Sequence, residues 1–358
     1  NLTPSEIYRL WVNEHSEPAA KASLNSAKIL RKVAVIVIAD ANGSDLDAAV
    51  SSLESHTSVA TVSSVIMSGR DSKVFATDLL RALHDAAESA DDLVVVHQTD
   101  VLAPHAIQIL ASTGEKLAAD LVYSDHDRFD SQGQHADPEF TFGWSPEHLL
   151  GRNYIGGVYL FNAKLFKRIN TPAFSESVAS VLEKNPEAAS TLRYCLLLEL
   201  GNAAERVARV PDVLWTETTL PSAQRLTESL WASSFLDRFE PGSSLNEHSP
   251  SNGSGTARYV DRPLKSAPLV SIIIPTMAKL ELVTTCIESL LSLTDYSNFD
   301  IVILDNSRGK NPEGISYLVD KGLKIIKCDF DFNWPRLNNL GAKESDGELL
   351  LFLNDDVE

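Results

Sequence analysis

Polar and acidic residues follow three apolar runs of strand length in the last quarter of the chain. The three groups are Pro275-Thr276, Asp305-Asn306 and Asn354-Asp355-Asp356. A carboxylate after a strand can accept hydrogen bonds from a base edge or a ribose hydroxyl. Hard divalent cations prefer oxygen ligands and can bridge carboxylates to phosphate. The residue types are therefore compatible with a phosphate-bearing small ligand, provided that the fold brings the three groups together.

Strands and helices that would position these groups alternate along the chain. Continuous apolar runs at Lys32 to Ala39 and Leu269 to Ile274 suit strands buried on both faces of a parallel sheet. Helical periodicity follows each run, at Leu46, Val50 and Leu53 and at Leu282, Cys286, Ile287, Leu290 and Leu291. Further strands are predicted at Thr61 to Met67, Asp300 to Leu304, Leu93 to Val96 and Leu349 to Leu353. The pattern predicts an α/β fold with doubly wound sheets, whose ligands sit at the carboxyl ends of the strands.

Composition divides the chain into two domains. Residues 1–30 read as an amphipathic helical lead-in without a chemical signal, with Ile7, Leu10 and Trp11 on its apolar face. The stretch from Pro241 to Ala267 is rich in Gly, Ser, Pro and Asn, so we expect a linker there. The domains are then expected at 31–240 and 268–358.

Overall charge and cysteine usage restrict the function classes. The 358 residues carry 49 acidic and 31 basic side chains, a formal charge of −18, which argues against a nucleic-acid partner. The three cysteines show no CxxC spacing and fit reduced thiols in a cytoplasmic protein. No apolar run approaches the ~20 residues that span a bilayer. There is no secretory signal, and the start at Asn1 without methionine reads as a processing boundary.

From Pro268 onward the chain resembles family-2 glycosyltransferases of the GT-A fold. The resemblance rests on the order and spacing of LVSIIIPT (269–276), CIESLLSLTDYSNFDIVILDNS (286–307) and FNWPRLNNLGAKESDGELLLFLNDDVE (332–358). In that family this stretch is the nucleotide-binding half of a GT-A domain, a Rossmann-like, doubly wound mixed sheet. The resemblance thus implies two such domains, the second present only as this half.

The resemblance also implies roles for individual residues. Contacts to a nucleotide-diphosphate sugar fall on Pro275, Thr276, Asp305, Asn306, Asn339 and Asp355, and Mn²⁺ or Mg²⁺ would be held by Asp356 and Asp355. Asn354 stands where many members have the first aspartate of this metal motif, and Asn339 with Gly341 is expected to open a helix. The alternatives are that Asp305 only caps its loop, that Gly341 only packs a helix, and that 354–356 is a solvated turn.

Two features depart from the family's catalytic pattern. Met277-Ala278 replaces a pair that is often polar or aromatic followed by Asn or Asp. The family's general base would lie beyond Glu358, so the catalytic residue is unknown and residues 1–358 alone are expected to be inactive.

The first domain resembles the same family more distantly. The matching stretches are LVVVHQTDVLAPHAIQIL (93–110) and the segment from Ala119 to Asn162. The family pattern places possible acceptor or glycan contacts at Asp125, Asp127, Trp144 and Tyr154. Aromatic residues of this kind are equally compatible with a core role.

The catalytic positions of the first domain differ from the family. His97, Gln98 and Thr99 replace metal-binding aspartates, so that only Asp100 remains, and Arg193-Tyr194-Cys195 replaces the segment near the base. The first strand also ends in Ala39-Asp40-Ala41-Asn42 without the expected proline-threonine. We interpret the domain as one that kept its core and lost its donor site. A metal held by His97 and Asp100 is the alternative, whereas a zinc site lacks further ligands.

Together these features favour a metal-dependent, inverting glycosyltransferase that builds a surface polysaccharide or cell-wall glycan. Its partners would be a nucleotide-diphosphate sugar and a glycan or lipid-linked glycan acceptor, without nucleic acid. No transmembrane segment is expected, and attachment to the inner face of the membrane stays open. One alternative is a non-catalytic glycan-binding or scaffolding module. Another alternative is a nucleotidyltransferase, which would require a glycine-rich loop with a lysine or arginine after the first strand. Neither residues 39–43 nor residues 276–280 form such a loop.

Overall fold

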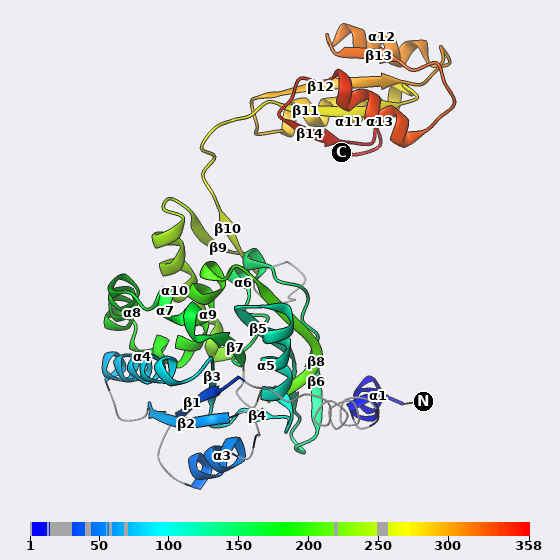
Figure 1. Cartoon of the computed structure of the whole chain (residues 1–358). Helices are drawn as coiled ribbons and strands as arrows, with labels where there is room; N and C mark the ends of the chain where they lie inside the picture. Colours follow the sequence, from blue (N-terminus) through cyan, green and yellow to red (C-terminus); the bar gives the residue numbers. More distant parts are fainter. Residues whose placement is uncertain are drawn as a thin grey trace. The chain divides into compact units, whose positions relative to one another are not determined.

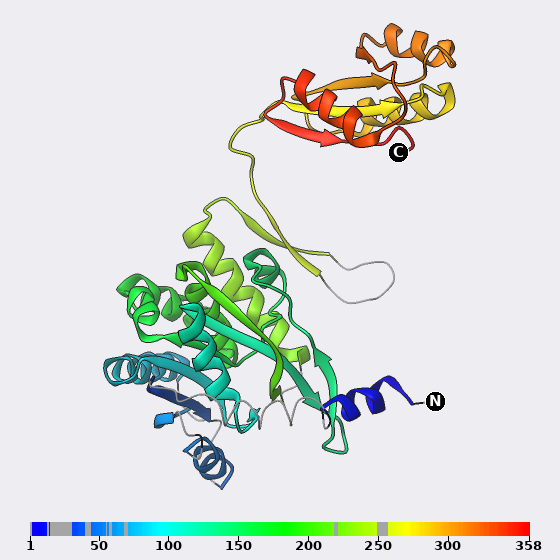
Figure 2. The ribbon, with the colours of Figure 1, turned by 45° about the vertical axis from the view of Figure 1, so that its right-hand side comes forward.

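The computed structural model describes residues 2–12, 14, 31–39, 44–54, 56, 59–67, 71–217, 221–248 and 257–358. The chain forms two compact units, Asn1–Arg262 and Pro263–Glu358 (Figure 1). Each combines a β-sheet with helices on both of its faces, which confirms the α/β class (Figure 2). Residues 40–42, where the first strand was expected to depart from the family, lie outside the described residues.

A mixed sheet forms the centre of the first unit. Its strands are β1 (Val33–Ala39), β2 (Val59–Ile66), β3 (Asp92–His97), β4 (Val101–Leu102), β5 (Leu121–Phe129), β6 (His135–Glu139), β7 (Tyr159–Asn162) and β8 (Val207–Glu217). They are ordered β2-β1-β3-β7-β5-β8-β4, and β6 pairs with β5. Strands β1, β2 and β3 are parallel, whereas β7 runs antiparallel to both of its neighbours.

Helices cover both faces of this sheet, which is why all seven residues of β1 are buried. The helices are α1 (Pro4–Trp11), α3 (Ser44–Glu54), α4 (Ser72–Ser89), α5 (Ala106–Leu117), α6 (Pro146–Gly151), α7 (Ala163–Ile169), α8 (Pro172–Lys184), the 3₁₀ helix η2 (Pro186–Thr191), α9 (Leu192–Ala203) and α10 (Pro221–Phe239). Residues of α3 and α5 pack on one face, and those of α4 and α7 to α10 pack on the other.

The predicted linker at 241–267 contains a β-hairpin instead. Strands β9 (Ser244–His248) and β10 (Ala257–Asp261) pair antiparallel, and the boundary between the units falls after Arg262. Leu245 and Val260 pack against the core of the first unit, and the Arg258 side chain donates to the Gly151 carbonyl at 3.0 Å. The Gly- and Ser-rich composition that suggested a linker lies mostly in residues 249–256, which are not described.

The lead-in is helical from Pro4 to Trp11, and Thr3 and Glu6 form a capping box at its start. Residues 15–30 of the predicted lead-in lie outside the described residues. Its aromatic residues Tyr8 and Trp11 contact Phe140 at centroid separations of 6.3 and 6.0 Å. The Tyr8 hydroxyl donates to a buried carboxylate of β5, so the helix contributes a polar contact that its amphipathic pattern did not reveal.

The second unit is a four-stranded parallel sheet in the order β13-β12-β11-β14. Its elements are β11 (Val270–Thr276), α11 (Leu280–Leu293), β12 (Phe299–Asp305), α12 (Pro312–Asp320), β13 (Lys324–Lys327), α13 (Trp334–Glu344) and β14 (Leu349–Phe352). Residues of α11 and α12 pack with one face, while Leu337 of α13 packs with the other. Strand β13 was not predicted, because its two lysines and two isoleucines give no clear period.

Strand β14 is apolar yet exposed. Its side chains Leu349, Leu350, Leu351 and Phe352 are 40–53% exposed, whereas Ile272, Ile273 and Ile274 of β11 are at most 2% exposed. The difference follows from position, since β14 is the outermost strand on its side of the sheet.

Candidate functional site

The strand ends of the second unit gather the groups singled out in the sequence. Strands β11 and β12 are parallel and in register, so Thr276 lies opposite Asp305. On the other side, β14 pairs with β11 up to Ile273 opposite Phe352, and the chain then turns back toward β11. There the Thr276 hydroxyl donates to Asp355 Oδ2 at 2.5 Å. The side chains that the sequence placed after three separate strands therefore lie at one edge of the sheet.

Thr276 also organises the turn that follows β11. Its Oγ1 accepts a hydrogen bond from the Ala278 amide at 2.8 Å, and Ala278 has a φ of 54° and no exposed surface. Gly314 of α12 packs against this turn so closely that a Cβ there would lie 1.9 Å from the Ala278 carbonyl oxygen. Met277-Ala278, which departs from the family pattern, thus forms a tightly held turn.

Asp305 and Asn306 are largely buried, with exposed fractions of 7% and 3%. Asp305 Oδ1 accepts a hydrogen bond from the Ser307 amide at 2.8 Å, which is the loop-capping contact that the sequence left as an alternative. Asn306 donates its side-chain amide to the Cys328 and Phe330 carbonyls and its backbone amide to the Thr276 carbonyl. Asn306 therefore ties the ends of β11, β12 and β13 together and holds Asp305 in place.

The prediction that Asn339 and Gly341 open a helix is wrong. Helix α13 begins at Trp334 with Asn333 as its cap, and Asn339 is an exposed residue in its middle. Pro335 near the helix start and the capping Asn333 carried the missed signal. Gly341 faces the sheet, where a Cβ would lie 2.4 Å from Ile273 Cγ2, so this glycine serves helix packing.

Trp334 joins the site from the start of α13. Its indole nitrogen donates to Asn354 Oδ1 at 3.4 Å, and the side chain is 46% exposed. In the sequence, Trp334 stood out only as part of the stretch 332–358 that resembles the family, and no role was predicted for it. An exposed aromatic ring beside polar strand ends is the kind of surface on which a flat ligand can stack.

Carboxylates influence two thiols at the strand ends of the second unit. Burial raises the pKa of the Cys286 thiol, and the charges of Asp355 and Asp356 raise it further. Burial also raises the pKa of the Cys328 thiol, with Asp305 adding to the effect. Both thiols therefore stay protonated, and the carboxylates around them form a site suited to a cation.

The oxygen donors at this edge fit a hard divalent ion only in part. Asp355 is half-buried and Asp356 is exposed, and Asn354 adds an amide oxygen. Over the described ranges, no group of three or more His, Cys, Asp or Glu side chains is arranged to hold a metal alone. A Mg²⁺-type ion here would thus use one or two carboxylates and take its remaining oxygens from a ligand.

In the first unit, the corresponding edge is closed by an ion pair. Strand β1 lies between β2 and β3 as β11 lies between β12 and β14, and all of these pairs are parallel. Asp100, which follows β3, pairs with Arg193 at 2.5 Å, with side-chain exposures of 0% and 12%. Arg193 also donates to the Gly157 carbonyl at 3.1 Å. Arg193, one of the departures from the family pattern, is therefore in contact with Asp100, the aspartate that remains in the altered segment 97–100.

Asp125 and Asp127 are occupied by internal contacts. Asp125 accepts two hydrogen bonds from Arg209 Nη2, at 2.8 and 2.9 Å, and one from the Thr141 hydroxyl. Asp127 has no exposed surface and is bonded by the Tyr8, His135 and Thr216 side chains. Tyr8, Arg209 and Thr216 lie at least 84 positions from the aspartates that they contact, so no local spacing signalled these contacts.

Trp144 and Tyr154 lie in different environments. Tyr154 is 1% exposed, its ring stacks on Phe142, and its hydroxyl accepts from the Ser145 amide at 3.0 Å. This places Tyr154 in the core, which is the alternative that the sequence left open. Trp144 is only partly buried and lines a pocket between α6, α9 and α10.

Comparison with known proteins supplies a family for the C-terminal residues. Residues 271–358 match the family model described as Glycosyl transferase family 2, so the second unit carries a domain of this family. Within the described residues, no helix has the length and apolar character needed to cross a bilayer.

Two curated relatives align with most of the chain. The O-antigen biosynthesis protein RfbC of Myxococcus xanthus is 30% identical over 298 residues, covering 78% of this chain and 22% of that protein. The uncharacterized protein y4gI of Sinorhizobium fredii is 26% identical over 281 residues, covering 74% and 30%. The chain thus spans less than a third of either relative.

Solved structures align more weakly. S. aureus TarS 1–349 in complex with UDP aligns at 12% identity and a TM-score of 0.34, covering 59% of this chain and 67% of that one. Glucosyl-3-phosphoglycerate synthase from Mycobacterium tuberculosis, solved with Mg²⁺ and UDP, aligns at 14% identity and a TM-score of 0.32, covering 68% and 91%. The family match over 271–358 is therefore the comparison that bears on the site.

Proposed function

We propose that this chain is part of an inverting, metal-dependent glycosyltransferase that acts in surface polysaccharide or cell-wall glycan synthesis. The second unit would bind the nucleotide-diphosphate sugar at the carboxyl ends of β11, β12 and β14. Two findings support this role. One is the family-2 glycosyltransferase domain at 271–358, and the other is the similarity to an O-antigen biosynthesis protein. Both units would have the GT-A fold, with the donor site kept in the second.

The contact between Thr276 and Asp355 is the observation that carries this proposal. It brings the acidic turn after β14 next to β11 and β12, where Asp305 is held by Asn306 and the Ser307 amide. Asp305 would accept hydrogen bonds from the nucleoside, and Pro275 and Thr276 would form the wall beside it. The assignment of Asn339 to the donor has no support beyond its exposure.

Asp355 and Asp356 would hold Mn²⁺ or Mg²⁺ together with two phosphate groups of the donor. When bound, the ion would neutralise the negative charge that develops on the leaving diphosphate. The chain's own contribution is positional: the Thr276 hydroxyl orients Asp355, while exposed Asp356 can turn toward a ligand. The acceptor hydroxyl would attack the anomeric carbon from the face opposite the diphosphate.

Alanine variants of Asp305 and Asp356 test the proposal. We expect each to weaken Mn²⁺-dependent UDP binding at least about 10-fold, since each loses a charge-assisted contact worth about 1.5–3 kcal/mol. Isothermal titration of the chain with UDP, with and without Mn²⁺, is the measurement. Asp346→Ala is the matched control, because Asp346 is an exposed acid before β14, at the opposite end of that strand. Binding by both site variants as tight as by the control would refute the assignment.

A second candidate function concerns the first unit, which we propose is a non-catalytic module that binds glycan or organises the assembly. The buried pair between Arg193 and Asp100 supports its non-catalytic character. The guanidinium occupies the place where a metal-dependent donor site would hold its metal ion, and it has no acceptor atom with which to bind one. Titration of an Asp355→Ala, Asp356→Ala chain with UDP and Mn²⁺ tests this role. Saturable, metal-dependent binding that remains in this variant would contradict it.

A further inference from the structure

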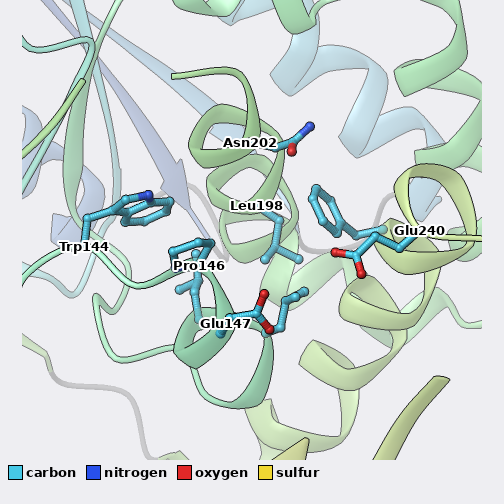
Figure 3. Close-up of a pocket in the computed structure, with 9 residues that line it drawn as sticks. Trp144, Pro146, Glu147, Leu198, Asn202 and Glu240 are labelled. Atoms are coloured by element: carbon cyan, nitrogen blue, oxygen red, sulfur yellow. The ribbon is translucent and has the colours of Figure 1, made fainter. Parts of the chain in front are cut away.

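A pocket of about 200 Å³ lies in the first unit between α6, α9 and the end of α10. Its lining includes Trp144, Glu147, Leu198, Asn202, Phe235 and Glu240. Figure 3 shows the Trp144 indole on one side, Leu198 at the centre, and the carboxylates of Glu147 and Glu240 near one another. Neither Arg193 nor Asp100 lines the pocket. The pocket is therefore distinct from the edge after β3 that this ion pair occupies.

The Trp144 indole is fixed in place as one wall of the pocket. Gly201 of α9 leaves the room for it, since a Cβ at Gly201 would lie 2.4 Å from Trp144 Cη2. The next residue, Ser145, is also held in place. Its amide donates to the buried Tyr154 hydroxyl, and its side chain caps α6. The indole is thus oriented before any ligand arrives, which lowers the entropic cost of binding.

The two carboxylates at the pocket are likewise held in position. Arg262 donates to both oxygens of Glu147 at 2.9 Å and to both oxygens of Glu240 at 2.5 and 3.1 Å. This bridge joins α6 to the residue after α10 and keeps the two acceptors side by side. Asn202, in the last turn of α9, adds an exposed amide with both donors and an acceptor.

The combination of an aromatic wall, apolar floor and polar rim matches one pyranose ring. A pyranose presents C–H groups on its faces, which pack against an aromatic ring, and hydroxyls around its edge, which bond to carboxylates and amides. The pocket is smaller than the roughly 300–1,000 Å³ of sites for larger ligands, so it suits a single sugar unit rather than a nucleotide sugar.

Charge selects among the sugars. Within the Arg262 bridge, two carboxylates and one guanidinium sum to a charge of −1 (−2 + 1). Uronic acids and sugar phosphates would be repelled, although solvent screening limits the effect at these exposed side chains. A neutral or amino sugar meets no such repulsion.

From these observations we infer that the pocket of Trp144, Glu147, Asn202 and Glu240 is a binding site for a neutral pyranose unit of a glycan. The inference rests on the proposed role of the first unit as a glycan-handling module. It names the ligand class and separates the glycan site from the strand-end site that the ion pair closes.

Ligand-observed saturation-transfer NMR on the whole chain tests this site. The probes are the methyl pyranosides of glucose, galactose and rhamnose as neutral ligands, with glucuronate as the acidic one. We expect at least one neutral pyranoside to bind with a Kd of about 1–10 mM, as a site with one stacking wall and few hydrogen bonds allows. Glucuronate should bind at least about threefold more weakly.

Variants locate the binding. Trp144→Ala should weaken the neutral pyranoside at least about 10-fold, whereas Phe140→Ala, at a 55% exposed aromatic outside the pocket, should not. Because Trp144 also packs against the core, Glu240→Gln supplies a second variant that keeps the indole, with an expected weakening of about threefold. Its melting temperature, compared with that of the parent chain, verifies folding.

Two outcomes would overturn the inference: no neutral pyranoside binds, or Trp144→Ala and Glu240→Gln both bind as the parent does. A separate titration with UDP and Mn²⁺ measures nucleotide binding at the proposed donor site of the second unit. If UDP binds while no pyranoside does, the glycan pocket fails and the donor assignment stands. If the pyranoside binds while UDP does not, the reverse holds.

Discussion

The two units treat the same edge of their sheets in opposite ways. In the first unit, the aspartate after β3 is fully buried and paired with Arg193. In the second, the acidic turn after β14 keeps Asp355 half-buried and Asp356 exposed, and Asp355 accepts a hydrogen bond from the neutral Thr276 hydroxyl. A carboxylate paired with arginine has its charge compensated, which weakens its attraction for a metal cation. The comparison teaches that a single arginine can occupy a strand-end carboxylate, whereas the corresponding carboxylates of the other unit stay accessible.

The units also differ in how well the equivalent strand is covered. Leu93, Val94, Val95 and Val96 of β3 are at most 1% exposed, because β7 pairs with β3 on its far side and helices cover both faces. The four residues of β14 are 40–53% exposed. An apolar strand with an open edge pairs readily with another strand, so we expect the second unit to be the one that limits solubility.

The largest expected effect is loss of Arg193. Arg193→Ala leaves Asp100 buried without its partner, which typically costs about 3–5 kcal/mol of folding free energy. Chemical unfolding of the parent and the variant measures the cost for the first unit. Replacing both partners, with Arg193→Met and Asp100→Asn, should recover most of the loss, because no unpaired charge is then buried. A loss below about 1 kcal/mol for the single variant would show that the pair does not close the site.

Crowding a glycine in the second unit has the next largest effect. Gly341→Ala places a Cβ 2.4 Å from Ile273 Cγ2 and 3.0 Å from Leu304 Cδ1, and overpacking of this kind costs about 1–3 kcal/mol. Only the transition of the second unit should shift in differential scanning calorimetry. A matching shift in the first unit's transition would mean that the two units do not unfold independently.

Acid should destabilise the first unit through His126. Burial lowers the pKa of His126 to about 3, so the folded state binds fewer protons than the unfolded state between about pH 6.5 and 3. The stability is present above pH 6.5 and is lost as the pH falls through this window, at up to about 1.4 kcal/mol per pH unit. All nine histidines precede residue 249, so this dependence belongs to the first unit.

His126→Gln removes the titrating group and should flatten the dependence by one proton, measured as melting temperature from pH 7 to pH 4. His84→Gln, at an exposed position in α4, is the control. Equal slopes for the His126 variant and the parent would contradict the assignment.

The smallest effect is expected at an exposed ion pair of the second unit. Arg308 and Asp331 lie 2.6 Å apart with side-chain exposures of 42% and 100%, so Arg308→Ala should leave the free energy of unfolding nearly unchanged. Chemical unfolding compares this change with the loss caused by Arg193→Ala. Similar losses of unfolding free energy at the two pairs would show that burial does not determine how much an ion pair of this protein contributes to stability.

The sequence predicted most strands that carry the sites, because buried parallel strands are continuous apolar runs. Val33–Ala39 forms β1 as expected, and the register that places Thr276 opposite Asp305 follows from parallel pairing. The predicted start of α13 at Asn339 was five residues late, since Trp334 and Pro335 were read as a motif rather than as a helix start.

Contacts between distant residues could not be predicted in this way. Arg193 and Asp100 are 93 positions apart. Arg193 was noticed only as a departure from a family pattern, and Asp100 only as the aspartate that remained. Tyr8 and Asp127 are 119 positions apart, and neither carries a local sign of the other. Such pairs depend on how the sheet and helices pack, which periodicity does not encode.

The stoichiometry of UDP binding tests the central difference between the units most directly. Isothermal titration of the whole chain with UDP in Mn²⁺ should give one site per chain, which disappears when the ion is chelated and in the Asp355→Ala, Asp356→Ala variant. Two metal-dependent sites would show that the first unit still binds a donor despite its ion pair. No site at all, or one that survives in the variant, would contradict the role of the acidic turn after β14.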